Sequence, residues 1–202
     1  MARIKLNDRD IRPHLWGFVA RERAADDLMM IEEVQIERGR TRIDLLAVNS
    51  AIHGYEIKSD RDTLVRLKRQ VRSYNRVTNT MTLVVGERYV EPATEIVPKW
   101  WGIITAHPDG SLVRLERVRE CKPNPSLKLE RQVIFATVDD LKRFASSQGV
   151  KAAWKMTRYQ LIAELLKRIE AGEMTAALME RCIRDSLRQL PTKRAEFAAK
   201  AA

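Results

Sequence analysis

The stretch TRIDLLAVNSAIHGYEIK, residues 41–58, decides the fold of this chain. Two largely apolar runs flank the dipeptide Asn49-Ser50, which favours a turn. The preceding segment, IEEVQIE, alternates between polar and apolar residues and ends at the turn signal Arg38-Gly39-Arg40. Three short strands separated by short turns are typical of an antiparallel meander. The expected strands are residues 31–37, 41–48 and 51–58.

Helices and further strands surround this meander. Apolar residues at helical spacing predict one helix over residues 8–28 and another over residues 60–77, which Ser59 could cap. A loop is expected around Pro92. The other expected elements are strands at 81–86, 100–106 and 111–118 and helices at about 138–147, 157–171 and 175–189.

Together these elements predict an α/β (α+β) fold with a mixed central sheet. The composition changes near Cys121, where a Pro-containing segment begins. We therefore expect a core over residues 1–120, a helical C-terminal extension over residues 121–190 and a flexible tail over residues 191–202.

The composition of the 202 residues limits the classes of function. Lys and Arg number 37 and Asp and Glu 27, so the formal net charge is +10. This excess favours an acidic partner such as nucleic acid, although it could also serve solubility alone. No apolar run is long enough to span a membrane, and none resembles a signal peptide. Two distant cysteines and three scattered histidines offer no disulfide framework or zinc site, which suits the cytoplasm.

Three charged residues of the meander indicate a chemistry. Asp44 lies among apolar neighbours in the middle of its strand, and Glu56 and Lys58 end the next strand on one face, with Ile57 turned to the core. Buried acids repel each other unless a cation lies between them. Asp44, Glu56 and the carbonyl of Ile57 could therefore hold Mg²⁺ or Mn²⁺, and Lys58 could orient an attacking water. A solvated cross-strand salt-bridge cluster would use the same residue types.

Three segments in order resemble the PD-(D/E)XK nuclease superfamily, whose fold is restriction-endonuclease-like. They are R-x-D-L-L-A-V from Arg42, G-Y-E-I-K-S-D from Gly54, and R-L-x-x-Q-x-x-x-Y from Arg66. Within the superfamily they are most similar to a small bacterial family of unassigned role. The resemblance covers about residues 30–105 and implies an αβββαβ core with a mixed central sheet, to which this chain adds C-terminal strands and helices.

The resemblance also implies roles for individual residues. Asp44 and Glu56 would be metal ligands and Lys58 the catalytic lysine, while Gln70 and Tyr74 on the following helix would support the site. A glutamate near the end of the first helix often completes such sites. The candidates for this glutamate are Glu33 first, then Glu32 and Glu22.

The chain departs from the superfamily pattern at one position. Ile43 stands where the superfamily name has a proline, at a position that varies widely among its members.

The function expected from these residues is metal-dependent hydrolysis of nucleic-acid phosphodiester bonds, with DNA favoured over RNA. Arginines near the site would contact the phosphate backbone. The alternative is a catalytically silent nucleic-acid-binding protein on a nuclease scaffold, within a repair, defence or regulatory complex. By analogy with nucleases that pair to cut two strands, a homodimer or larger complex is also expected. The candidate phosphate contacts are Arg40, Arg42, Arg66, Arg69 and Arg72.

Three further expectations concern features outside this set. The helices at 157–171 and 175–189 could form a helix-turn-helix reader of DNA, or could simply pack together. Trp100 and Trp101 could stack on bases, but the core of the sheet is the favoured place for them. Lys58 ends its strand, so we expect it near solvent and expect Lys58→Ala to abolish cleavage without affecting folding.

Overall fold

The computed structural model describes residues 5–23 and 27–190, with only the backbone of Arg38. The tail expected over residues 191–202 lies outside the described residues, and the helix expected to reach residue 28 ends at Glu22, with Arg23 as its C-cap. The chain divides into two compact units between Leu127 and Lys128, seven residues after the predicted boundary. Across the described ranges, no helix is long and apolar enough to cross a membrane.

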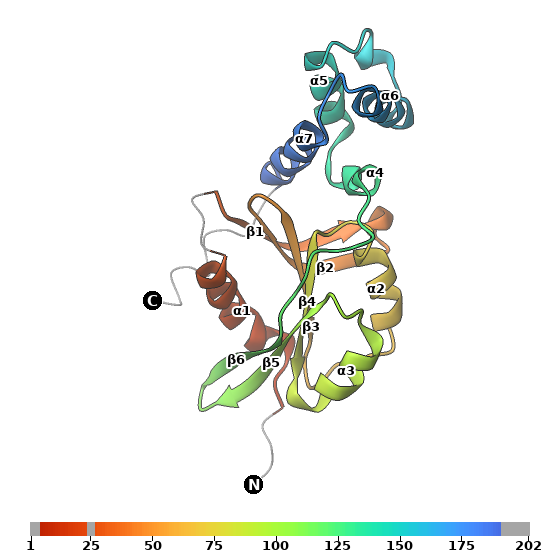
Figure 1. Cartoon of the computed structure of the whole chain (residues 1–202). Coiled ribbons are helices and arrows are strands. Elements are labelled where there is room, and N and C mark those ends of the chain that lie inside the picture. Colours follow the sequence, from red (N-terminus) through yellow and green to blue (C-terminus); the bar gives the residue numbers. More distant parts are fainter. Residues whose placement is uncertain (1–4, 24–26, 191–202) are drawn as a thin grey trace. The chain divides into compact units, whose positions relative to one another are not determined.

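A six-stranded mixed sheet forms the first unit, and its strand order follows the sequence (Figure 1). The first three strands form the predicted antiparallel meander, the next two pair in parallel, and the last two form a hairpin. The mixed α/β fold is as predicted. The strands are β1 (Met29–Ile36), β2 (Thr41–Val48), β3 (Ile52–Lys58), β4 (Thr80–Gly86), β5 (Gly102–Asp109) and β6 (Leu112–Arg119).

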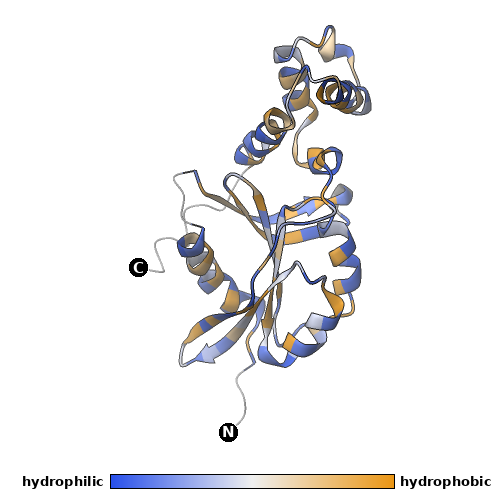
Figure 2. Cartoon of the chain, viewed as in Figure 1, coloured by the Kyte–Doolittle hydropathy of each residue, from blue (hydrophilic) through white to orange (hydrophobic). Residues whose placement is uncertain are grey.

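Helices cover both faces of this sheet (Figure 1). One face carries α1 (Asp8–Glu22), and the other carries α2 (Leu67–Tyr74) and α3 (Val90–Ile96). Each of these helices shows both hydrophilic and hydrophobic residues, as expected for a helix that buries one side on a sheet (Figure 2). Short 3-10 turns at Glu37–Gly39 and Glu87–Tyr89 follow β1 and β4.

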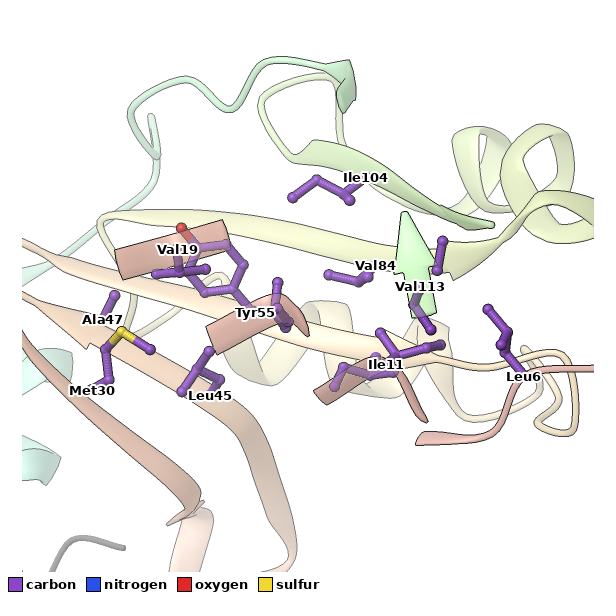
Figure 3. Close-up of a cluster of buried hydrophobic side chains, with 13 residues drawn as sticks. Leu6, Ile11, Val19, Met30, Leu45, Ala47, Tyr55, Val84, Ile104 and Val113 are labelled. Carbon is purple, nitrogen blue, oxygen red and sulfur yellow. The ribbon is translucent and has the colours of Figure 1, made fainter. Parts of the chain in front are cut away.

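The main hydrophobic core lies between α1 and the sheet (Figure 3). Ile11 and Leu15 of α1 meet Leu45 of β2 and Ile57 of β3, so Ile57 faces the core as predicted. Because side chains alternate along a strand, the neighbours of these core residues face the side of the sheet that carries α2. This alternation directs Asp44, Glu56 and Lys58 away from the main core.

Two predictions around α2 and α3 are wrong. The helix expected from residue 60 begins at Leu67, because the backbone N–H and hydroxyl of Ser59 both donate to Asp62, at 2.9 and 2.7 Å, and close a turn instead. The loop expected around Pro92 contains α3. Pro92 lies in the first turn of that helix, where a missing N–H breaks no intrahelical hydrogen bond.

Helices alone form the second unit. Both α6 and α7 pack on α5, and both ends of α6 follow familiar capping chemistry. Thr157 accepts from the backbone of Gln160 in a capping box, and Gly172, with a φ of +72°, follows the end of α6. The helices are α4 (Leu129–Gln132), α5 (Val138–Ser147), α6 (Arg158–Glu170) and α7 (Ala176–Arg188), with 3-10 turns at Val133–Phe135 and Ala153–Lys155.

The expected packing face of α6 and α7 is largely buried. Leu161, Leu165, Met179 and Ile183 are at most 1% exposed. Leu178, also predicted to pack, is 40% exposed. The buried positions therefore serve the core of the unit, and DNA reading by this helix pair stays a prediction.

The core makes a direct stability prediction. Leu45 is fully buried in the cluster under α1, so Leu45→Ala should lower the free energy of unfolding by about 2–5 kcal/mol through lost contacts and a cavity. Chemical denaturation measures the loss. Leu112→Ala is the control, because Leu112 is 60% exposed and its truncation should cost far less. Equal losses in both variants would contradict this description of the core.

Candidate active site

A polar cleft of about 390 Å³ opens where β2 and β3 separate, on the side of α2. Carboxylates, arginines and one lysine from α1, β1, β2, β3 and α2 line it. The lining residues are Asp8, Arg12, Glu33, Gln35, Gly39, Arg40, Thr41, Arg42, Asp44, Glu56, Ile57, Lys58, Asp62, Arg66, Arg69 and Gln70.

Asp44 lies where the ladder between β2 and β3 ends. The last paired residues are Leu45 and Tyr55. One step beyond, the Asp44 carboxylate itself accepts the backbone N–H of Ile57 at 2.7 Å. A side-chain oxygen thus takes the place of a backbone carbonyl, which satisfies the N–H while the two strands move apart. The cleft follows from this substitution.

The neighbouring strand β1 is also irregular where it passes Asp44. Glu33 of β1 has a φ of +58°, in the left-handed region, although the residues on either side of it keep their register with β2. The carbonyl of Asp44, across from Glu33, accepts instead from the Arg12 guanidinium at 2.9 Å. A non-glycine residue in this conformation costs on the order of 1 kcal/mol or more, and such strain is concentrated at functional sites. It turns the Glu33 side chain into the cleft.

The guanidinium of Arg12 connects the acids on one side of the cleft. One of its nitrogens lies 3.0 Å from Glu33 and 3.8 Å from Asp44, and it also pairs with Asp8. Glu33 forms a second ion pair with Arg42. Burial alone would lower the pKa of Arg12, but these carboxylates raise it, so Arg12 stays charged. Arg12 therefore holds Asp44 and Glu33 in place.

Glu56 is 1% exposed and is surrounded by donors. Lys58, itself 5% exposed, pairs with one carboxylate oxygen, to which the amide nitrogen of Gln70 also donates at 2.5 Å. The hydroxyl of Tyr74 donates to the other oxygen at 2.7 Å. Trp101, fully buried, stacks on Tyr74 with ring centroids 6.2 Å apart. The orientation of Glu56 is thus fixed by the core.

Asp44 and Glu56 are buried close together, and this environment raises the pKa values of Asp44 and Tyr74. Burial and the neighbouring Glu56 raise the pKa of Asp44 to about 8, although the N–H of Ile57 and the charges of Arg12 and Lys58 oppose the shift. Burial and the negative charge of Glu56 also raise the pKa of Tyr74, so its hydroxyl stays protonated as a donor. The acids therefore lie in a region that an additional cation would stabilise.

The donors present fit a hard divalent cation that retains water. Asp44 and Glu56 offer carboxylate oxygens, and Ile57, whose N–H points to Asp44, turns its carbonyl to the same side of the strand. The side-chain oxygen of Gln70 is buried and has no hydrogen-bond partner among the described residues. Within the part of the chain that the structure describes, no three His, Cys, Asp or Glu side chains form a ready-made metal cage. Two carboxylates and a carbonyl suit Mg²⁺ better than zinc.

The structure brings together most residues that the sequence singled out. Glu33 is the candidate glutamate that lines the cleft, whereas Glu32 accepts from the indole of Trp16 at 2.7 Å and Glu22 pairs with Arg117. Four of the five candidate arginines line the cleft, but Arg72, exposed on α2, lies outside the lining.

Two expectations about single residues need correction or completion. The prediction that Lys58 lies near solvent is wrong, because its ammonium is buried against Glu56, and Lys58→Ala would leave that acid uncompensated. Arg12 and Asp8 were missed altogether. They come from the first helix, and their spacing carries no signal that they would meet the strands 32 residues later.

Comparisons with known proteins place the chain in a family. Over residues 1–194 it matches the family model described as bacteriophage P4 protein cII. The chain belongs to the bacteriophage P4 protein cII family. Protein cII of Enterobacteria phage P4 is 21% identical over 145 residues, which cover 72% of this chain and 55% of that protein. This member of the cII family therefore spans about half the length of that curated relative.

A solved structure of a protein of unknown function from Silicibacter pomeroyi is also similar to this cII-family chain. The two are 15% identical, with a TM-score of 0.45, and the alignment covers 77% of this chain and 99% of the Silicibacter pomeroyi chain.

The raised pKa of Asp44 predicts a dependence of stability on pH in this cII-family protein. A carboxyl whose pKa rises on folding, from its ordinary 3.8 to about 8, stabilises the fold at low pH and loses that contribution as the pH rises to about 8. Asp44→Asn holds no charge, and its side-chain oxygen can still accept from Ile57. In EDTA, the rise in melting temperature of the variant over the wild type should therefore be small at pH 5 and larger at pH 8.5.

Thermal unfolding at both pH values checks this prediction. Asp109→Asn, at an exposed position in the β5–β6 hairpin, controls for the general effect of removing one carboxylate. If Asp44→Asn changed the melting temperature equally at pH 5 and pH 8.5, the Asp44 carboxyl would not be the titrating group.

Proposed function

We propose that this protein is a metal-dependent nuclease that hydrolyses phosphodiester bonds of nucleic acid, with DNA as the favoured substrate. The observation that carries the proposal is the meeting of Asp44, Glu56 and Lys58 in one cleft, beside the backbone of Ile57. The order of these residues on adjacent strands is that of the PD-(D/E)XK resemblance, which stays a prediction. The proposal includes a cytoplasmic location, which the free Cys121 and Cys182 suit.

The chain's own residues divide the chemistry between them. Asp44 and Glu56 would hold Mg²⁺ or Mn²⁺, and the bound ion would lower the pKa of a water and stabilise negative charge on the phosphate. Lys58 pairs with Glu56, where its ammonium can orient the attacking water and compensate the negative charge that develops on the phosphoryl oxygens. The free side-chain oxygen of Gln70 can accept a hydrogen bond from that water.

Charge on the rim of the cleft suits a polyanion. Arg40, Arg66 and Arg69 are exposed and line the opening, and Arg42 is 58% exposed beside Glu33. Arginines in this position can pair with successive phosphates of one strand. A homodimer or a larger complex, in which two clefts act on two strands, is part of the proposal.

One observation favours the catalytically silent alternative. Lys58, Gln70 and Tyr74 already satisfy both oxygens of Glu56 in this arrangement. A site in which the lysine permanently replaces the metal would bind nucleic acid through the rim arginines without cutting it. The two functions differ in whether divalent metal binds through Asp44 and Glu56.

Cleavage assays test the proposal. Supercoiled, linear and single-stranded DNA would be incubated with Mg²⁺, Mn²⁺ or EDTA. Lys58→Met keeps the apolar stem and should reduce cleavage by about 100-fold or more, as expected for loss of one preorganised charge. Lys68→Met, at an exposed position on α2, should leave cleavage unchanged.

Controls for folding belong to this experiment, because Lys58→Met leaves Glu56 buried without its ion pair. The double variant Glu56→Gln/Lys58→Met removes both charges and should fold yet remain inactive. Cleavage by this double variant would contradict the proposed site. Salt-sensitive DNA binding by the wild type, with neither cleavage nor metal binding, would support the silent scaffold instead.

The cleft also predicts which arginine matters for binding. Arg69→Ala should reduce the slope of log K against log salt by about 1, because one phosphate contact is lost. Arg72→Ala is the matched control, three residues further along α2 and outside the cleft lining. Fluorescence anisotropy in EDTA at several salt concentrations measures both slopes. A slope for Arg69→Ala equal to that of the wild type would show that DNA does not enter the cleft along this side.

A further inference from the structure

The second unit exposes two aromatic side chains. Trp154 is 68% exposed and Tyr159 is 76% exposed. The other tryptophans of the chain are partly or fully buried, and Trp101 is fully enclosed. Large aromatic rings are usually covered in folded proteins, so two such rings five residues apart indicate a contact surface.

The backbone that presents these rings is well defined. Ala152, which precedes the 3-10 turn of Trp154, has a φ of +55° in the left-handed region. Arg158 donates to the carbonyl of Ala136 at 2.9 Å and so ties the start of α6 to the turn before α5. Tyr159 lies in the first turn of α6, which the Thr157 capping box fixes. The backbone on both sides of the rings is thus held by the capping box and by the hydrogen bond of Arg158.

The segment is also positively charged. Residues 151–163 contain Lys151, Lys155 and Arg158 and no acidic residue. The ammonium of Lys155 lies 4.8 Å from the centre of the Trp154 ring, within the range of a cation–π contact. Lys151 and Lys155 are exposed. Lys155 thus lies against Trp154, and the segment from Lys151 to Tyr159 carries exposed rings and lysines without an acidic residue.

We propose that Lys151, Trp154, Lys155 and Tyr159, together called the Trp154 surface, bind a single-stranded nucleic acid. The rings would stack on unpaired bases and the lysines would contact the phosphates between them. Binding at this surface requires neither the cleft nor a metal. The proposal therefore goes beyond the nuclease function and does not depend on it.

The chemistry favours a single strand over the other occupants. Bases inside a duplex already stack on one another, so exposed rings gain little from double-stranded DNA. A protein partner that covered tryptophan and tyrosine would also have to bury or neutralise the two lysines beside them. Phosphates and bases alternate along a single strand and match both components of the surface.

Binding of fluorescein-labelled oligonucleotides to the full-length protein in EDTA tests the proposal. The probes are dT₃₀, rU₃₀ and a duplex, and the first two distinguish DNA from RNA. Trp154→Ala should raise the Kd for a single-stranded probe by about 10-fold, in line with loss of one stacked base. Trp154→Phe should keep most of the affinity. Leu178→Ala, at an exposed apolar position of the same unit, should have no effect.

Tryptophan emission supplies a second readout. A single-stranded probe should quench the emission of the wild type, and the quenching at saturation should fall in Trp154→Phe although that variant still binds. Circular dichroism confirms that the variants fold. Because EDTA prevents cleavage, an inactive nuclease site would leave these results unchanged.

An unaltered Kd for both single-stranded probes in Trp154→Ala/Tyr159→Ala would overturn the proposal and leave a protein as the occupant. An equal loss in Leu178→Ala, or an equal loss of duplex affinity, would overturn it as well.

Discussion

The hydrogen bond from the Ile57 amide to the Asp44 carboxylate is the interaction on which the site depends. A sheet normally closes every such amide with a backbone carbonyl of the next strand. Here a side chain takes that role, so β2 and β3 can part without leaving a buried N–H unsatisfied. The same carboxylate is thereby drawn to the floor of the opening, where it meets Glu56. One bond thus both opens the sheet and places an acid in the opening.

The rest of the site is anchored in the core rather than in loops. Glu56 and Lys58 are nearly inaccessible to water, and hydrogen bonds from Gln70 and Tyr74 help to offset the cost of burying this ion pair. Tyr74 in turn rests on Trp101. The packing of Trp101 therefore also sets the polar geometry of the site, and a substitution of Trp101 would shift the position of the Glu56 carboxylate. Such preorganisation suits a site that must hold like charges close together.

Much of this arrangement follows from short-range patterns. Alternation along β3 suffices to place Glu56 and Lys58 on one face, and the spacing along α2 suffices to align Gln70 with Tyr74. Contacts between distant segments do not follow from such patterns. Arg12 meets the strands only through the docking of α1, and no local rule reveals that the ammonium of Lys58 is buried. For the same reason, the early start expected for α2 fails, since the turn at Ser59 competes with the helix.

The order of the strands has a consequence for how the chain folds. Each strand after β1 pairs with the strand just before it in the sequence, so every pairing within the sheet joins consecutive strands. The antiparallel pairings close short loops and form quickly, whereas the two parallel pairings of β4 span connections that contain α2 and α3. The meander and α2 are complete by Tyr74. Asp44 and Glu56 can thus be brought together early, whereas the stacking of Trp101 on Tyr74 and the packing of α1 on β6 require the later part of the chain.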